Sequence, residues 1–353
     1  MFHLYLPLLV LFAAYGTSSL LIRRMIAVAV IDIPGHRSAH ASPTPKGGGV
    51  GVVVAFLLFL VPLRGLCGLP PLTMEVGGLW SAVTLLAIVS WLDDVYQWSP
   101  LIKLAAQILA AVIVTLTALP VDGFTGITAL CVAAVLSVGW LVFVANTVNF
   151  MDGLNGLVSG VLCLSFLALA LPFWPGDSQD LRVASALTAF GLLAFLPFNF
   201  PNARIFLGDV GSQSGGLLIG AAALSLATHG PMALPPDLRA ALLVPCLTGG
   251  LLYDVTITLI RRALAGEKIL EAHRGHLYQV AYRSGVPKTA VSLVHWGFVI
   301  WGGCAFAMTA MPGFRPSEGI GGVAITLALV ALPQLLWTAF VLWRVKRHPV
   351  GRW

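Results

Sequence analysis

Long apolar stretches, each about the length of a membrane-spanning helix, follow one another along almost the whole of this chain. A helix needs about 20 predominantly apolar residues to cross the hydrocarbon core of a bilayer. Only 10% of the 353 residues are charged, whereas soluble domains carry roughly 25%. The sequence therefore predicts an all-α, polytopic membrane protein, and nothing in it suggests a nucleic-acid-binding domain.

About eleven transmembrane helices can be drawn, with soft boundaries. They cover residues 3–22, 47–65, 76–92, 101–118, 127–145, 154–172, 184–200, 213–229, 238–258, 290–311 and 320–343. Arg23 and Arg24 follow the first span, which argues against a cleavable signal peptide and holds that end in the cytoplasm. The N-terminus is then periplasmic, the C-terminus is cytoplasmic, and 16 of the 20 Lys and Arg face the cytoplasm. We treat 1–353 as a single integral membrane domain that contains a basic cytoplasmic loop at 261–290.

Five short polar segments interrupt the apolar chain, each after an odd-numbered span. They are residues 32–49, 93–94, 146–156, 206–212 and 273–276. Since every odd-numbered span ends on the cytoplasmic side, all five should meet at that membrane face. Polar and ionisable groups within or beside the hydrocarbon are costly and are functional suspects. The order of spans therefore predicts one site built from five separate segments.

Carboxylates and amides in three of these segments suit a hard divalent cation. The oxygen donors are Asp93, Asp94, Asn146, Asn149, Asp152 and Asp209. Mg²⁺ commonly takes one or two carboxylates together with substrate phosphates and water. Taken alone, an Asp-Asp pair after an apolar span is more typical of a solvated helix end. The convergence of four polar segments favours the metal site.

Two glycine-containing segments are placed to bring cationic or N–H groups to a phosphate. Residues 206–212 open the eighth span with a glycine on each side of Asp209, and helix N-termini of this kind bind phosphate. Residues 43–49 carry Lys46 into the second span, followed by glycines that can adopt positive φ. An ordinary turn and a flexible linker are the respective alternatives.

The basic segment at 273–276 contains His273, Arg274 and His276. Zinc is a weak interpretation, because no cysteine or third histidine lies nearby. Guanidinium and imidazole groups aimed at a diphosphate fit better, and a solvated loop is the alternative. Asp254 lies two turns before Arg261 and is either an internal hydrogen-bond partner or a catalytic group.

In combination these motifs resemble the polyprenyl-phosphate N-acetylaminosugar-phosphate transferases of glycosyltransferase family 4, in the branch that initiates O-antigen and enterobacterial common antigen synthesis. The resemblance extends in order from residue 32 to His276. It includes Leu92-Asp-Asp94 followed by Lys103 and Gln107, Asn149-Phe-Met-Asp-Gly153, and Phe206-Leu-Gly-Asp209. No single motif would be sufficient.

The family resemblance implies an activity, a cofactor and a location. The implied reaction transfers an amino-sugar phosphate from a UDP-N-acetylamino sugar to undecaprenyl phosphate and releases UMP, with Mg²⁺ or alternatively Mn²⁺. The implied location is the bacterial inner membrane, with the site on its cytoplasmic face and a role in lipopolysaccharide synthesis. A homodimer is compatible with the resemblance. Direct attack by the lipid phosphate and a two-step route through an aspartyl-phosphate both stay open.

The resemblance also implies roles for the matching residues. Asp209 is the leading metal ligand with Asp152 beside it, Asp93 deprotonates or orients the lipid phosphate, and Asp94 supports Asp93. His276 is expected to be catalytic. The expected substrate-binding residues are Lys46, Lys103, Asn146, Asn149, Asn155, His273 and Arg274.

This sequence departs from the family pattern at two places. Asn155 stands where the family often has a second acid, and the basic loop lacks the triple histidine of the pentapeptide transferases. A role that needs a carboxylate at position 155 is therefore absent or moved. The loop difference disfavours a muramoyl-pentapeptide donor and favours sugars such as UDP-N-acetyl-fucosamine or UDP-N-acetyl-quinovosamine.

A transporter that uses its acids as a cation or proton relay is the alternative from another class of protein. The acids gather at one membrane face instead of the midplane, and no inverted repeat is visible. The sequence therefore favours the transferase.

Overall fold

The computed structural model describes residues 2–28, 30–32, 42–120, 124–174, 178–228, 238–268, 274–310 and 320–351. Within these ranges the chain is helical apart from one short antiparallel ribbon, in which β1 (Val30–Asp32) pairs with β2 (Thr44–Lys46). The long helices are α1 (Phe2–Val28), α2 (Gly49–Leu66), α3 (Met74–Tyr96), α4 (Pro100–Ala118), α5 (Ile127–Met151), α7 (Gln179–Asn199), α8 (Gly208–Thr228), α13 (Lys288–Ala310) and α14 (Ile320–Arg347). The predicted all-α membrane architecture is confirmed.

The described residues contain 9 helices that are long and apolar enough to cross a membrane. The sixth predicted span is shorter than expected, because α6 (Leu157–Leu169) has only 13 residues. The ninth is broken into α9 (Leu238–Ala241), α10 (Leu243–Leu247) and α11 (Gly249–Leu264). Two glycines at the last break pack tightly: a Cβ on Gly250 would lie 2.6 Å from the Phe298 ring. The span count and the orientation of the termini stay predictions.

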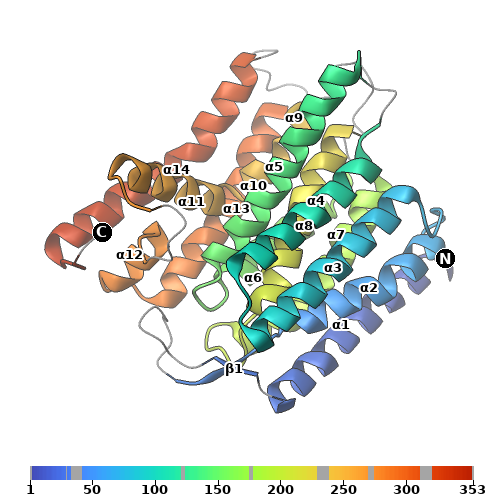
Figure 1. Ribbon diagram of the computed structural model, residues 1–353, viewed down its shortest axis with the longest axis horizontal. Helices are drawn as coiled ribbons and strands as arrows, with labels where there is room; N and C mark the ends of the chain where they lie inside the picture. The colour runs from blue at the N-terminus through green and yellow to red at the C-terminus, as the bar shows by residue number, and fades with distance from the viewer. Residues whose placement is uncertain are drawn as a thin grey trace.

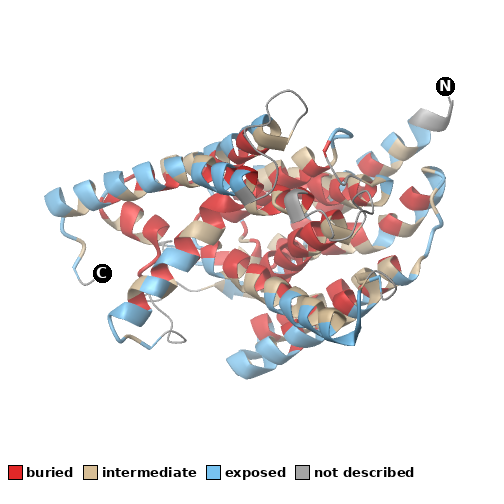
Figure 2. Ribbon diagram, turned by 90° about the horizontal axis from the view of Figure 1, so that it is seen from above, coloured by how far each residue is buried: buried red, intermediate tan, exposed pale blue. Residues whose placement is uncertain are grey.

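Helix α8 lies in the middle of the bundle (Figure 1), and most of its side chains are buried. Small residues allow its neighbours to approach closely, as is common between membrane helices. A Cβ on Gly216 would lie 2.6 Å from Ala145 Cα in α5, and a Cβ on Gly49 in α2 would lie 2.2 Å from Gly211 Cα. Figure 2 shows buried residues along the interior of the bundle and exposed residues on its outer helices. The starts of α2 and α8 are thus held against each other.

The predicted loop at 261–290 has a helix of its own. Helix α11 continues into it as far as Leu264, α12 spans Leu277–Arg283, and α13 begins at Lys288. Figure 1 shows α11 and α12 near α14, on the side of the bundle away from α1. The fold therefore places a basic helical segment beside one end of the membrane bundle.

Candidate active site

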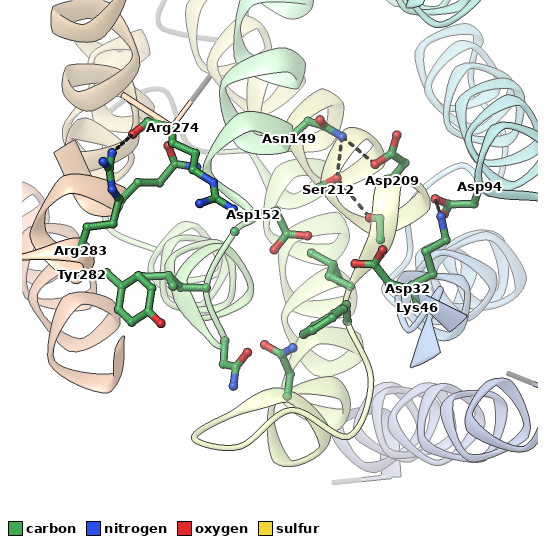
Figure 3. A pocket seen from close by; sticks show the side chains of 18 residues that line it. Asp32, Lys46, Asp94, Asn149, Asp152, Asp209, Ser212, Arg274, Tyr282 and Arg283 are labelled. Carbon is green, nitrogen blue, oxygen red and sulfur yellow. Dashed lines mark hydrogen bonds and ion pairs between the residues drawn. The ribbon is translucent and has the colours of Figure 1, made fainter. Parts of the chain in front are cut away.

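One end of the bundle contains a pocket of about 360 Å³, and each of the five predicted polar segments contributes to its lining. Figure 3 shows Asp94 and Asp209 on one side of this pocket, Arg274 and Arg283 on the other, and Asp152 between them. The full lining is Asp32, Lys46, Asp94, Asn149, Asp152, Gly153, Leu154, Asn155, Asn199, Phe206, Leu207, Gly208, Asp209, Ser212, Arg274, Gln279, Tyr282 and Arg283. Segments far apart in the sequence thus form one site.

Ion pairs connect the acids on one side of the pocket. Lys46 Nζ lies 2.9 Å from Asp94 Oδ1, while Lys103 Nζ lies 2.7 Å from Asp93 Oδ2 and 3.0 Å from Asp209 Oδ2. Asp93 Oδ1 and Asp94 Oδ2 are buried and have no hydrogen-bond partner. Buried carboxylate oxygens without partners are costly, so this cluster has unused capacity for a cation or a proton.

Backbone contacts bring Lys46 and Asp209 to the same place. The N–H groups of Gly48 and Gly49 donate to the carbonyls of Phe206 and Leu207, at 2.9 and 2.8 Å. Gly208 adopts φ of 73°, and a Cβ there would lie 3.0 Å from Gly47 N. The glycines before α2 therefore pack against the turn before α8, which excludes the flexible-linker alternative for them.

The loop between α5 and α6 carries Asp152 and is held by side chains from other helices. The contacts are Tyr278 Oη to Phe150 O (3.2 Å), Ser292 Oγ to Asn155 O (2.8 Å), Trp296 Nε1 to Gly156 O (2.8 Å) and Gly156 N to Asn199 Oδ1 (2.7 Å). Asn155 donates its own amide to Pro201 O at 3.1 Å. Asp152 thus projects from a loop with a fixed backbone, as a preorganised site requires.

Comparison with known proteins connects this geometry to a family. Residues 76–227 match the model of glycosyl transferase family 4. A decaprenyl-phosphate N-acetylglucosaminephosphotransferase of Mycolicibacterium smegmatis is 32% identical over 352 residues, covering 87% of this chain and 82% of the relative. The chain belongs to glycosyl transferase family 4.

Other relatives in family 4 differ in the sugar named for them. An undecaprenyl-phosphate alpha-N-acetylglucosaminyl 1-phosphate transferase of Thermotoga maritima is 28% identical, covering 76% of this chain and 79% of the relative. A phospho-N-acetylmuramoyl-pentapeptide-transferase of Streptococcus pneumoniae is 32% identical, covering 56% of this chain and 63% of the relative. The family model and these relatives together confirm the family that the sequence motifs resemble.

The carboxyl group of Asp152 has a pKa well above its ordinary value. Burial, together with the smaller effect of the negative charges of Asp209 and Asp94, raises the pKa of its carboxyl to about 8. Without a cation, Asp152 is therefore largely protonated at neutral pH. A bound divalent cation would favour the ionised carboxylate, since opposite charge stabilises it.

The family 4 site has donors of the right kind for a hard cation. Among the described residues, no three acid, histidine or cysteine side chains already stand in a ligating arrangement. Asp152 and Asp209 nevertheless both line the pocket, and Lys103 now neutralises Asp209. Carboxylate oxygens that face a pocket fit Mg²⁺ in kind.

Several residues that the sequence placed at the site do not line the pocket. Asp93 and Lys103 stand directly behind Asp209, and Asn146 is bonded to Gln107. His273 lies outside the described residues. Arg274, Lys46, Asn149 and Asn155 do line the pocket, and their binding of substrate stays a prediction.

His276 is buried, with 4% of its surface exposed, and belongs to an internal network. Its Nδ1 lies 3.3 Å from Asp254 Oδ1, and the same carboxylate accepts hydrogen bonds from the N–H groups of Leu277 and Tyr278, both at 2.8 Å. Asp254 is therefore an internal hydrogen-bond partner that fixes the start of α12. His276 lies beside the pocket instead of in its lining.

The sequence interpretation missed several lining residues: Asn199, Ser212, Gln279, Tyr282 and Arg283. Ser212 lies within the predicted segment at 206–212 and accepts a hydrogen bond from Asn149 at 3.1 Å. Arg283 donates to Arg274 O at 3.1 Å. The many basic residues in the loop at 261–290 could have indicated Arg283 as a lining residue. Nothing in the sequence indicated Asn199, which lies at the end of α7.

Proposed function

We propose that this chain transfers an N-acetylated amino-sugar phosphate from a UDP-sugar to undecaprenyl phosphate and releases UMP. The observation that carries the proposal is a single pocket with Asp152 and Asp209 facing Arg274 and Arg283. A diphosphate bound with a divalent cation needs both kinds of group. The names of the family relatives describe N-acetylglucosamine phosphate transfer to decaprenyl or undecaprenyl phosphate, which supports the same chemistry.

Charge repulsion is the main obstacle in this reaction, because both the lipid phosphate and the donor diphosphate are anions. A lipid-phosphate oxygen forms a bond to the β-phosphorus of the donor, and the bond from that phosphorus to UMP breaks. The sugar keeps its phosphate throughout. Arg274 and Arg283 are suited to hold phosphate oxygens with paired N–H donors, and they reduce the repulsion from the side opposite the acids.

Asp209 and Asp152 would hold Mg²⁺, or Mn²⁺, which when bound neutralises charge on the diphosphate. Lys103 is placed to exchange its contact with Asp209 for a phosphate oxygen, since its ammonium group also keeps a contact of 2.7 Å with Asp93. Asp93 Oδ1 has no hydrogen-bond partner. The family resemblance makes Asp93 the candidate to accept a proton from the lipid phosphate or to orient it.

We place the site at the cytoplasmic face of the inner membrane, where UDP-sugars are available and the acceptor phosphate lies at head-group depth. The relatives' names favour N-acetylglucosamine as the sugar, and we propose its UDP form as the donor. The basic-loop pattern favours the N-acetylated deoxysugars of O-antigen synthesis. Both donor classes belong in the first assay.

The test is UMP release by purified protein in detergent with undecaprenyl phosphate and a panel of UDP-amino sugars. We expect UMP only when lipid, donor and Mg²⁺ are all present, and none after chelation of the metal. Omission of lipid is the matched control for simple hydrolysis of the donor. Absence of UMP with every donor tested, together with uptake of a cation by proteoliposomes, would replace the transferase by the transporter.

A further inference from the structure

The three helices that supply Lys103, Asn149 and Asp209 are connected a second time, one turn deeper in the bundle. Lys103 and Gln107 lie four residues apart on α4, and Asp209 and Gln213 lie four residues apart on α8. On α5, Asn146 precedes Asn149 by three residues. Residues three or four apart on a helix share one face. One turn below each of the three pocket-side residues, the same helix therefore carries a residue with a side-chain amide.

The three deeper residues form a hydrogen-bonded cluster, which we call the amide layer: Gln107, Asn146 and Gln213. Asn146 Nδ2 donates to Gln107 Oε1 at 2.7 Å, and Gln107 Nε2 lies 3.1 Å from Gln213 Oε1 and 3.3 Å from Asn146 Oδ1. Asn146 Nδ2 also donates to Val142 O at 2.9 Å, one turn back on its own helix. Gln107 thus joins α5 to α8.

The layer above joins the same three helices, but through Asp209 on α8 and with charged groups. Asp209 accepts from Lys103 Nζ at 3.0 Å and from Asn149 Nδ2 at 3.2 Å. A helix advances 1.5 Å per residue, so a slip of one residue in any of the three helices would break these contacts. The amide layer opposes such a slip.

Burial makes the hydrogen bonds of the amide layer hard to replace. Gln107 and Gln213 are 3% and 2% exposed, so few water molecules can replace a lost partner at this depth. Other buried polar side chains on the same three helices behave differently. Thr115, Thr147 and Ser214 have hydroxyl oxygens without a hydrogen-bond partner, so they join no other helix through them.

We propose that the amide layer Gln107–Asn146–Gln213 sets the relative register of α4, α5 and α8 and thereby positions Lys103, Asn149 and Asp209 for the cation and the phosphates. This assigns Asn146 a positioning role in place of the substrate contact expected from the sequence. The proposal rests on the proposed function for its catalytic consequence, but its structural part does not need substrate or metal.

The test replaces each amide by leucine: Gln107→Leu, Asn146→Leu and Gln213→Leu. Each variant has a control on the same helix that alters a buried polar group without a partner: Thr115→Val, Thr147→Val and Ser214→Ala. The first measurement is hydrogen–deuterium exchange of the full-length protein without metal or substrate. We expect faster exchange in peptides from the first turns of α4 and α8 in the amide variants, and wild-type exchange in the controls.

The second measurement is the Mg²⁺ concentration that gives half-maximal UMP release, together with KM for the donor. Loss of groups that orient metal ligands typically costs about 10–100-fold in metal affinity, so we expect at least about a tenfold higher Mg²⁺ requirement with a smaller change in donor KM. The double variant Gln107→Asn with Asn146→Gln keeps the combined side-chain length across the α4–α5 contact. It should recover only the part of the loss that comes from the α4–α5 contact, because Gln107→Asn shortens the side chain that reaches Gln213.

Two results would overturn the proposal. One is wild-type exchange in the first turns of α4 and α8 of all three amide variants. The other is faster exchange with an unchanged Mg²⁺ requirement, which would make the layer a stability element only. If the wild-type protein releases no UMP at all, the proposed function fails, while the exchange measurement still decides whether the amides hold the helix ends.

Discussion

Asp209 is the residue on which the contacts of the site converge. It opens α8, pairs with Lys103 and accepts a hydrogen bond from Asn149. The first turn of a helix favours a carboxylate because the backbone N–H groups there carry partial positive charge. One side chain therefore receives groups from two neighbouring helices and faces the pocket.

We predict that Asp209→Asn lowers UMP release by at least about 100-fold, because a preorganised charge next to the reacting phosphates is lost. The protein should stay folded, as judged by size-exclusion profile and melting temperature. Any remaining activity should require more Mg²⁺. The control is Glu75→Gln, because Glu75 lies at the start of α3, far from Asp93 and Asp94 at its other end; this variant should behave as wild type. An Asp209→Asn enzyme with near-normal turnover would contradict the assignment.

The raised pKa of Asp152 gives a prediction about stability and pH. Its pKa is about 8 in the folded protein, against about 3.9 in an unfolded chain. Between these values the folded state holds a proton that the unfolded state releases, so the free energy of unfolding falls as pH rises. Without divalent cations, the melting temperature should fall from about pH 6 to about pH 9, and less steeply in Asp152→Asn. Parallel curves for the two proteins would contradict the pKa shift.

Helix α12 is the element whose position decides the basic side of the pocket. It carries Gln279, Tyr282 and Arg283, and its first N–H groups are bound by the Asp254 carboxylate from α11. Thr258 also contacts this carboxylate, at 3.2 Å. One buried acid therefore connects the broken ninth span to the arginines of the pocket.

We predict that Asp254→Ala raises the donor KM about tenfold, because buried N–H groups left without an acceptor cost about 1–3 kcal/mol and loosen α12. The KM for lipid should change less, since Asp93 and Lys103 lie on other helices. Thr258→Val removes one contact to the carboxylate and keeps the rest, so it serves as the control. An Asp254→Ala enzyme with wild-type kinetics for both substrates would show that α12 is positioned by other contacts.

The helical elements and the convergence of the polar segments could be predicted from the sequence, because apolar length and motif order are local signals. The side chains within each segment were harder to place. Asn146 and Asn149 are both amides in one motif, but their offset of three residues puts Asn146 a turn deeper, against Gln107. His276 looked like a phosphate ligand, yet Asp254, 22 residues earlier, is its partner. Such pairings depend on helix packing that no single segment encodes.

At the scale of the whole molecule, the pocket occupies one end of the bundle and Arg64 marks the other. Arg64 is 1% exposed, donates to Pro70 O at 3.1 Å and pairs with Asp180. By the positive-inside rule, the charge pattern predicts that the end with Arg204, Arg274 and Arg283 faces the cytoplasm.

Thiol labelling tests that sidedness in a variant without its five native cysteines. A cysteine at Tyr282, which lines the pocket, should resist an impermeant maleimide in intact cells and react after lysis. A cysteine at Leu72, exposed at the opposite end, should react in intact cells. Labelling of position 282 in intact cells would reverse the orientation.

The fate of the donor's β-phosphate tests the central claim most directly, because it separates sugar-phosphate transfer from sugar transfer and from transport. The donor is a UDP-amino sugar that carries ³²P at the β position, incubated with purified protein, Mg²⁺ and undecaprenyl phosphate. We predict that the label moves with the sugar into the lipid extract and that the released nucleotide is unlabelled UMP. Label recovered in UDP, or no label in the lipid under any condition that supports donor binding, would contradict the account.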